Sequence, residues 1–106
     1  MPRPQPGEVW LVDLGMAAKV RPCLILSDYP AADELALIVV VPHTTAVRGN
    51  RWEFPLPLSF LKPGAFHLQQ VQPISLARLE RRLGILTAEQ FTGLARRLSA
   101  LLNLDR

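Results

Sequence analysis

The chain has 106 residues, of which 49% are hydrophobic, and carries a formal net charge of +3, with ten arginines and two lysines against nine acidic residues. This length fits a single domain, which we expect to span residues 1–106 around one core. The longest apolar run, residues 35–41, is far shorter than the roughly 20 residues that cross a bilayer, and a single cysteine excludes an internal disulfide and a cysteine-rich metal site.

The chain begins with a proline-rich segment, residues 1–6, which we expect to be extended and flexible. This segment lacks the apolar stretch and the cleavage site of a signal peptide. We therefore expect a cytoplasmic protein with no membrane contact. The mean hydropathy of +0.17 indicates surplus apolar surface in so small a domain, and we expect a homodimer to bury it.

Five strands are predicted, at residues 8–14, 20–27, 35–41, 51–56 and 64–71. The third is rich in β-branched residues, which favours a buried strand over a helix. In the fourth, Trp52 and Phe54 alternate with Arg51 and Glu53, the pattern of a strand with one buried face. Pro55 places this fourth strand at an edge of the sheet, because proline cannot donate to a ladder.

The C-terminal part of the chain ends in a helix. Residues 76–86 are ambiguous and fit a turn of helix followed by a short strand at residues 83–86. Residues 87–90 (TAEQ) then form a capping box, and the following leucines recur at helical spacing on one face. The fold class is therefore mainly β with a C-terminal helix, a small and mostly antiparallel barrel that the helix seals.

Polar residues stand at the ends of two apolar strands. Arg21 precedes the otherwise apolar residues 22–26, and the run at residues 35–41 ends in Pro42, His43, Thr44 and Thr45. An arginine offers a planar cationic fork, and threonines offer hydroxyl and backbone N–H groups, which together suit a phosphodiester. The pattern points towards RNA.

Taken singly, these residues have ordinary explanations. Arg21 fits a surface residue before a core strand, Thr44 and Thr45 fit strand or turn caps, and Glu8 fits an exposed strand position. His43 fits a histidine satisfied at a strand end, and Cys23 fits a small buried hydrophobe better than a nucleophile. The two histidines lack metal-ligand spacing and no glycine-rich phosphate loop is present, so we expect no metal and no cofactor.

Three motifs in sequence order resemble the MazF/PemK family, which includes the toxin Kid. They are residues 6–14 (PGEVWLVDL), 19–26 (KVRPCLIL) and 41–45 (VPHTT), and the likeness continues through residues 64–70 (GAFHLQQ) into the capped helix. The resemblance covers nearly the whole chain. It implies an SH3-like barrel of the type shared by MazF, Kid and the CcdB toxins.

The same resemblance implies a function. It indicates a homodimeric, metal-independent endoribonuclease of a type II toxin–antitoxin pair, an mRNA interferase that cuts single-stranded RNA at short sequences. Such enzymes leave a 2′,3′-cyclic phosphate and a free 5′-hydroxyl, and a cognate antitoxin blocks their groove with a segment that orders on binding.

Residue roles follow from the family pattern. Arg21 matches the arginine that holds the phosphate in the transition state, and Thr44 matches the catalytic threonine. Thr45 supplies further donors. Glu8 matches a glutamate of the substrate groove or one that orients the arginine. The residues expected to contact substrate are Glu8, His43, Thr45, Arg48, Arg51 and Gln69.

Two features depart from the family. Gln69 stands where Kid-like members carry an acid, and an amide cannot take a proton, so His67 is the candidate acid–base residue on the same strand face. A groove-lining role for His67 is the equal alternative. Residues 15–19 form a shorter loop than usual. The alternative functions are an inactive member that only binds RNA or antitoxin, and a CcdB-like gyrase poison.

Overall fold

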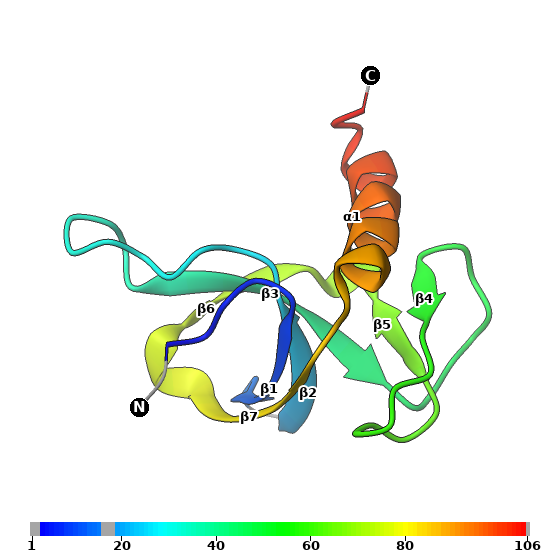
Figure 1. Ribbon diagram of the computed structural model, residues 1–106, viewed down its shortest axis with the longest axis horizontal. Helices are drawn as coiled ribbons and strands as arrows, with labels where there is room; N and C mark the ends of the chain where they lie inside the picture. The colour runs from blue at the N-terminus through cyan, green and yellow to red at the C-terminus, as the bar shows by residue number, and fades with distance from the viewer. Residues whose placement is uncertain (1–2, 16–18, 106) are drawn as a thin grey trace.

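The fold is seen in a computed structural model, which describes residues 3–15 and 19–105 (Figure 1). The described residues form seven strands, two short 3₁₀-helices and one α-helix, so the predicted mainly β class with a C-terminal helix is confirmed. In chain order the elements are β1 (Glu8–Asp13), β2 (Val20–Ile25), β3 (Leu37–Thr44), β4 (Glu53–Pro55), β5 (Ala65–His67), η2 (Leu68–Gln70), β6 (Gln72–Ser75), η3 (Leu76–Arg78), β7 (Leu79–Ile85) and α1 (Ala88–Leu102).

The strands pair antiparallel in one curved sheet. Its order is β4-β5-β3-β2-β1-β7, and β6 pairs with β3 beside this path. The long strand β3 therefore has β2 on one edge, while its other edge is shared by β6 along its first half and β5 at its end. In Figure 1, β4 and β5 lie on the side of the molecule where α1 stands. The predicted edge position of β4 is confirmed.

Both faces of the central strands are buried, which explains why their sequences are continuously apolar. On β2, Leu24 belongs to the cluster that α1 covers, whereas Cys23 and Ile25 belong to the cluster on the opposite face. The first cluster comprises Val9, Leu24, Val41, Phe66, Leu68, Leu86 and Leu94, and the second comprises Trp10, Val12, Cys23, Ile25, Ile38, Val40 and Ile74.

Strand β3 continues through Pro42 to Thr44, beyond the predicted end of this strand. The amide N–H of Val39 donates to Ser27 Oγ and its carbonyl accepts from Leu26 N, so residue 39 bonds on the β2 side. By alternation, the nitrogen of Pro42 faces the other edge, between the stretches that β6 and β5 pair. The missing N–H of Pro42 therefore breaks no ladder bond, and the strand continues through His43 and Thr44.

The fifth predicted strand, residues 64–71, was too long. Strand β5 ends at His67 because η2 begins at Leu68, whose N–H donates to the carbonyl of Trp52 at 2.9 Å. Strand β6 was not predicted, since Pro73 reads as a breaker. That proline lies on a strand with a single partner, β3. Residues 76–86, which the sequence leaves ambiguous, form η3 and the seven-residue strand β7. This strand starts at Leu79, earlier than the predicted start at residue 83.

Helix α1 begins as predicted. Gln90 N donates to Thr87 Oγ1 at 3.1 Å and Thr87 N donates to Gln90 Oε1 at 2.9 Å, which completes the capping box. Leu94 is fully buried against the sheet. The helix ends at Asn103, whose left-handed conformation (φ 60°) closes the last turn. Within the described ranges, no helix is long and apolar enough to cross a bilayer.

The start of the chain contacts the sheet where the sequence predicts a flexible segment. Pro4 is buried, Gln5 N donates to Glu8 Oε1 at 2.9 Å, and Gly7 N donates to the Ile25 carbonyl at 2.9 Å. Gly7 has φ +93°, a conformation that suits glycine. Met1 and Pro2, the rest of that prediction, lie outside the described residues, as do residues 16–18 of the short first loop.

Candidate functional site

A cleft of about 610 Å³ gathers six of the sequence-predicted site residues. It lies where β2 begins, β3 and β5 end, and η2 follows. We call it the Arg21 cleft. Its lining residues are Arg21, Pro42, His43, Thr44, Ala46, Arg48, Asn50, His67, Gln69 and Gln70. Residues from three separate chain segments, at position 21, 42–50 and 67–70, thus meet here.

Arg21 lies between this cleft and a second one. The second cleft, of about 350 Å³, is also lined by Arg21 and His43 and adds Thr45, Lys62 and Arg81. Arg21 is half-buried on β2. Its guanidinium therefore borders both clefts, and Lys62 and Arg81 add further cations to the second. Such an arrangement suits an extended anion better than a compact one.

Thr44 ends β3 with its hydroxyl oriented. Its Oγ1 accepts a hydrogen bond from the N–H of Ala46 at 3.0 Å, so the hydroxyl hydrogen is available to donate into the cleft. Thr44 is held from the other side by its pairing with Ala65 of β5. The neighbouring Thr45 is exposed and lines the second cleft instead.

His43 is a buried imidazole at the floor of both clefts. It is 4% exposed, its ring meets the edge of Phe66 at a centroid distance of 5.1 Å, and its Nε2 has no hydrogen-bond partner among the described residues. Burial lowers the pKa of His43 below its ordinary value. The ring is therefore neutral at neutral pH and can offer either a donor or an acceptor to a bound ligand.

This lowered pKa predicts a pH-dependent stability. Below pH 6.5 the unfolded chain takes up a proton at His43 that the folded chain resists, so the free energy of unfolding should fall as the pH falls from 6.5. The slope has an upper limit of about 1.4 kcal/mol per pH unit for one group. Urea unfolding followed by tryptophan fluorescence at pH 7.5, 6.5 and 5.5 measures it. His43→Gln should flatten the curve in this window, and an unchanged slope would contradict the assignment.

His67, at the end of β5, has its Nδ1 buried with no hydrogen-bond partner among the described residues. Its register partner on β4 is Glu53, so the two side chains lie on the same face. The imidazole thus lines the Arg21 cleft with a carboxylate beside it.

Glu53 is a site residue that the sequence analysis missed. The alternation in residues 51–56 places it opposite the buried face, yet it is only 6% exposed. The backbone N–H groups of Arg48, Gly49 and Asn50 all donate to its carboxylate, and these bonds enclose it. The sequence signal that could have predicted this arrangement is the turn at residues 48–51, which an acidic residue follows within three to five positions.

The pKa of Glu53 is lowered, chiefly by the N–H of Arg48 and against the opposing effect of burial. The N–H groups of Asn50 and Gly49, and the charge of His67, lower this pKa further. Glu53 is therefore ionised at neutral pH.

Gln69 reaches the Arg21 cleft by a different route from the one predicted. The prediction placed it on the same strand face as His67, but β5 ends at His67 and Gln69 lies in η2, where period-2 alternation does not apply. Gln69 is exposed and lines the cleft all the same. The side chain at this place in the cleft is an amide, which does not take up a proton at neutral pH.

Two other predicted site residues lie elsewhere, and so does Cys23. Glu8 accepts from Trp10 Nε1 at 3.0 Å and pairs with Arg82 Nε at 3.1 Å, outside the Arg21 cleft of this single chain. Arg51 faces a separate cleft beside α1. Cys23 packs in the core, and burial raises the pKa of its thiol to about 12 although the charge of Arg21 opposes this. The small-hydrophobe explanation for Cys23 is therefore favoured.

Gly64 allows β5 to approach the end of β3. A β-carbon at this position would overlap the carbonyl oxygen of Thr44 and lie 2.8 Å from His43 Cε1. Gly64→Ala should therefore displace Thr44 and lower the free energy of unfolding by about 1–3 kcal/mol. Urea unfolding checks this, with Gly93→Ala as the matched control, because a β-carbon at position 93 makes only ordinary contact at 3.5 Å. Equal stability of the two variants would contradict the prediction.

The chemistry of the Arg21 cleft is that of an anion site. Its donors are guanidinium, imidazole, hydroxyl and amide groups, and among the residues described no cluster of three or more His, Cys, Asp and Glu side chains is placed to hold a metal ion. Two guanidiniums, from Arg21 and Arg48, oppose the binding of a cation and favour that of a phosphate.

Comparison with known proteins agrees on one family. The sequence profile described as "PemK-like, MazF-like toxin of type II toxin-antitoxin system" matches residues 5–102. Endoribonuclease MazF3 of Mycobacterium tuberculosis (strain H37Rv) is 30% identical over 96 residues, which are 89% of this chain and 93% of that protein. Among solved structures, Mycobacterium tuberculosis toxin MazF-mt6 superposes with a TM-score of 0.76 at 30% identity, covering 91% of this chain and 96% of that one.

A second structure supports the fold alone. It is an endoribonuclease in complex with its cognate antitoxin from a mycobacterial species, with a TM-score of 0.79 at 24% identity, covering 96% of this chain and 97% of that one. The predicted fold type, that of the MazF toxins, is confirmed.

Proposed function

The chain belongs to the family of PemK-like, MazF-like toxins of type II toxin–antitoxin systems, and from this premise we propose that it is an endoribonuclease that cuts single-stranded RNA at specific sequences. The observation that carries the proposal is the gathering of Arg21, Thr44 and His67 from three strands onto one cleft. A relative of 30% identity over most of the chain is itself named an endoribonuclease.

The reaction that suits these groups is attack by the RNA's own 2′-hydroxyl. Its oxygen bonds to phosphorus while the bond from phosphorus to the 5′-oxygen breaks, giving a 2′,3′-cyclic phosphate and a 5′-hydroxyl. The 2′-proton passes to a base, and an acid supplies a proton to the departing 5′-oxygen. His67 is the one residue in the cleft proposed for proton transfer, and Arg21 and Thr44 stabilise the charge on the phosphorane.

The proposed reaction needs no metal ion, because the guanidiniums of Arg21 and Arg48 already supply positive charge at the cleft. The proposed assembly is a homodimer that works in the cytoplasm and is inhibited by a cognate antitoxin. Family membership in a toxin–antitoxin system supports the antitoxin. In a dimer, Glu8 and Arg51 of either copy remain candidates for contact with the substrate.

The deciding experiment is incubation of the purified protein with a long, structurally varied RNA in EDTA, followed by mapping of the new ends. We expect cuts that recur within one short sequence and leave 5′-hydroxyl and cyclic phosphate ends. Intact RNA with folded protein, or cuts that require added Mg²⁺, would overturn the proposal.

A second candidate function is a binding module that holds RNA or antitoxin without cutting. The presence of Gln69 in the Arg21 cleft, where a carboxylate is expected, favours it. The same experiment separates the two, because a module retains labelled RNA in a filter-binding assay while producing no new ends.

A further inference from the structure

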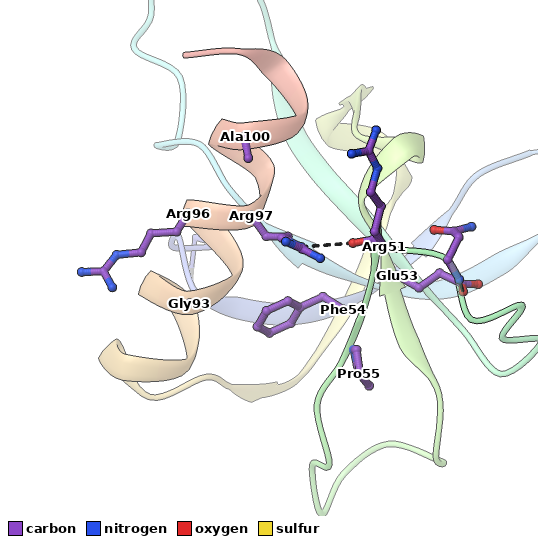
Figure 2. A pocket seen from close by; sticks show the side chains of 9 residues that line it. Arg51, Glu53, Phe54, Pro55, Gly93, Arg96, Arg97 and Ala100 are labelled. Carbon is purple, nitrogen blue, oxygen red and sulfur yellow. Dashed lines mark hydrogen bonds between the residues drawn. The ribbon is translucent and has the colours of Figure 1, made fainter. Parts of the chain in front are cut away.

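A second polar cleft lies between helix α1 and strand β4. It has a volume of about 540 Å³, within the range of small-ligand sites. Figure 2 shows it with α1 on one side and residues 51–55 on the other. We call it the α1/β4 cleft. The lining residues that matter below are Asn50, Arg51, Phe54, Gly93, Arg96 and Arg97.

The positive charges of this cleft are held in place. Arg97 reaches across it, and its Nε–H donates to the carbonyl oxygen of Arg51 at 3.1 Å (Figure 2). The guanidiniums of Arg51 and Arg97 lie 4.5 Å and 5.6 Å from the centroid of the same Trp52 ring. Two like charges thus share one indole, an arrangement that a bound anion would relieve.

Within the described part of the chain, no carboxylate neutralises these arginines. The ion pairs there are Arg78 with Asp13 and Arg82 with Glu8. Glu53 lines the cleft, but its carboxylate accepts the three backbone N–H groups of residues 48–50. In Figure 2 the side chain of Glu53 points away from Arg97. The charge of the α1/β4 cleft is therefore available to a ligand.

The cleft also has an aromatic wall. The half-buried ring of Phe54 faces α1 at Gly93, where a β-carbon would lie 3.5 Å from the ring tip. A cationic groove with an aromatic platform is the usual equipment for single-stranded nucleic acid, whose bases stack while phosphates meet arginine. Arg96 extends along the outer side of α1 and widens the positive surface.

The two clefts share a border residue. Asn50 lines both the Arg21 cleft and the α1/β4 cleft, with Arg48 on the first side and Arg51 on the second. The two clefts thus adjoin at Asn50, with an arginine on each side of it. This continuity favours a nucleic acid strand over a separate acidic peptide.

We propose that the α1/β4 cleft is a second RNA subsite, which holds a nucleotide flanking the cleaved bond. The inference rests on the proposed function. Arg51 and Arg97 bind its phosphate and Phe54 supports its base. The subsite gives Arg51, which lies outside the Arg21 cleft, a role in contacting the substrate. Its contribution is to affinity for longer RNA, not to the chemical step.

The test compares two substrates built around a cut site mapped in a long RNA: a short oligonucleotide confined to that site, and one extended at both ends. The Arg51→Gln/Arg97→Gln double variant should raise KM for the extended RNA by about 10- to 100-fold, with kcat unchanged. The KM for the short RNA, which does not extend into the α1/β4 cleft, should rise much less. Because one phosphate contact is lost, the slope of log K against log[salt] for extended RNA should weaken by about 0.7.

Two further variants sharpen the result. Arg3→Gln/Arg78→Gln removes the same charge from residues that line neither cleft, and should leave both substrates unaffected. Gly93→Gln fills the α1/β4 cleft without removing charge, and should raise KM for the extended RNA only. Equal losses on short and extended RNA, or none on either, would overturn the subsite.

Other outcomes overturn it as well. If poly-glutamate binding depends on Arg51 and Arg97 while RNA affinity does not, the cleft belongs to an acidic protein segment. A change of sedimentation coefficient in the double variant would assign it to a subunit interface. If no RNA is cut by the unaltered protein, the proposed function has failed instead; extended RNA then tests the subsite by filter binding.

Discussion

Arg21→Ala is expected to lower the rate of RNA cleavage by about 10³-fold, in the range seen when a cation is removed from phosphoryl transfer. The guanidinium lies between two clefts and is the charged group that both share. An attacked phosphate gains negative charge at its non-bridging oxygens, and a planar fork can bind two of them. Single-turnover cleavage of a labelled oligonucleotide measures the change.

Two companions make this result interpretable. Arg21→Lys keeps the charge but loses the fork, and should recover part of the rate. Arg3→Ala, which removes an arginine stacked on Tyr29 at 4.6 Å, should change nothing. Cleavage by Arg21→Ala within threefold of the unaltered protein, with matched circular dichroism, would rule out Arg21 as the transition-state cation.

His67→Gln is expected to lower the single-turnover rate by about 10²–10⁴-fold, the usual effect of losing a general base or acid. Gln69 cannot replace it, because an amide does not accept a proton at neutral pH. The affinity for uncleaved RNA should change little, since glutamine preserves a polar, hydrogen-bonding side chain in the cleft. Filter binding to RNA with a 2′-deoxy substitution at the cut site measures that affinity.

Chemical rescue separates proton transfer from simple contact. Added imidazole should restore part of the activity of His67→Ala and none of that of Arg21→Ala. If His67→Gln weakens binding and leaves the single-turnover rate at saturating RNA unchanged, His67 lines the groove and the proton is handled elsewhere.

Local signals were sufficient for much of the fold. The capping box at Thr87 and the apolar runs around Val9, Leu24 and Val41 predict α1, β1, β2 and β3 from short-range periodicity. Arg21, Thr44 and His67 were predicted from motifs, and the structure brings them to one cleft. The motif spacing could not give that proximity, because it arises from pairing between distant strands.

Two of the three features that the sequence did not reveal depend on partners far along the chain. Strand β6 contains Pro73 and forms because β3 offers it an edge, which no window around residue 73 indicates. Glu53 is buried because a turn folds back over it, against the period-2 pattern of its neighbours. Gln69 leaves the strand pattern where η2 begins. Strand β6 and the start of η2, where Leu68 N–H donates to the Trp52 carbonyl, are tertiary effects that override a local pattern, whereas Glu53 is enclosed by its own turn.

The turn that encloses Glu53 has a consequence for how substrate is received. Three consecutive backbone amides that converge on one carboxylate form a ready-made phosphate nest, and the chain occupies it with its own anion. RNA cannot use those amides, which leaves the side chains of Arg48 and Arg51 as the groups of this turn that are proposed to contact it. The three amides are already hydrogen-bonded before RNA binds. Of the two arginines in this turn, Arg48 lines the Arg21 cleft and Arg51 lines the α1/β4 cleft. Glu53 thereby holds the turn in one conformation before RNA binds. Binding therefore need not supply the free energy to order this turn.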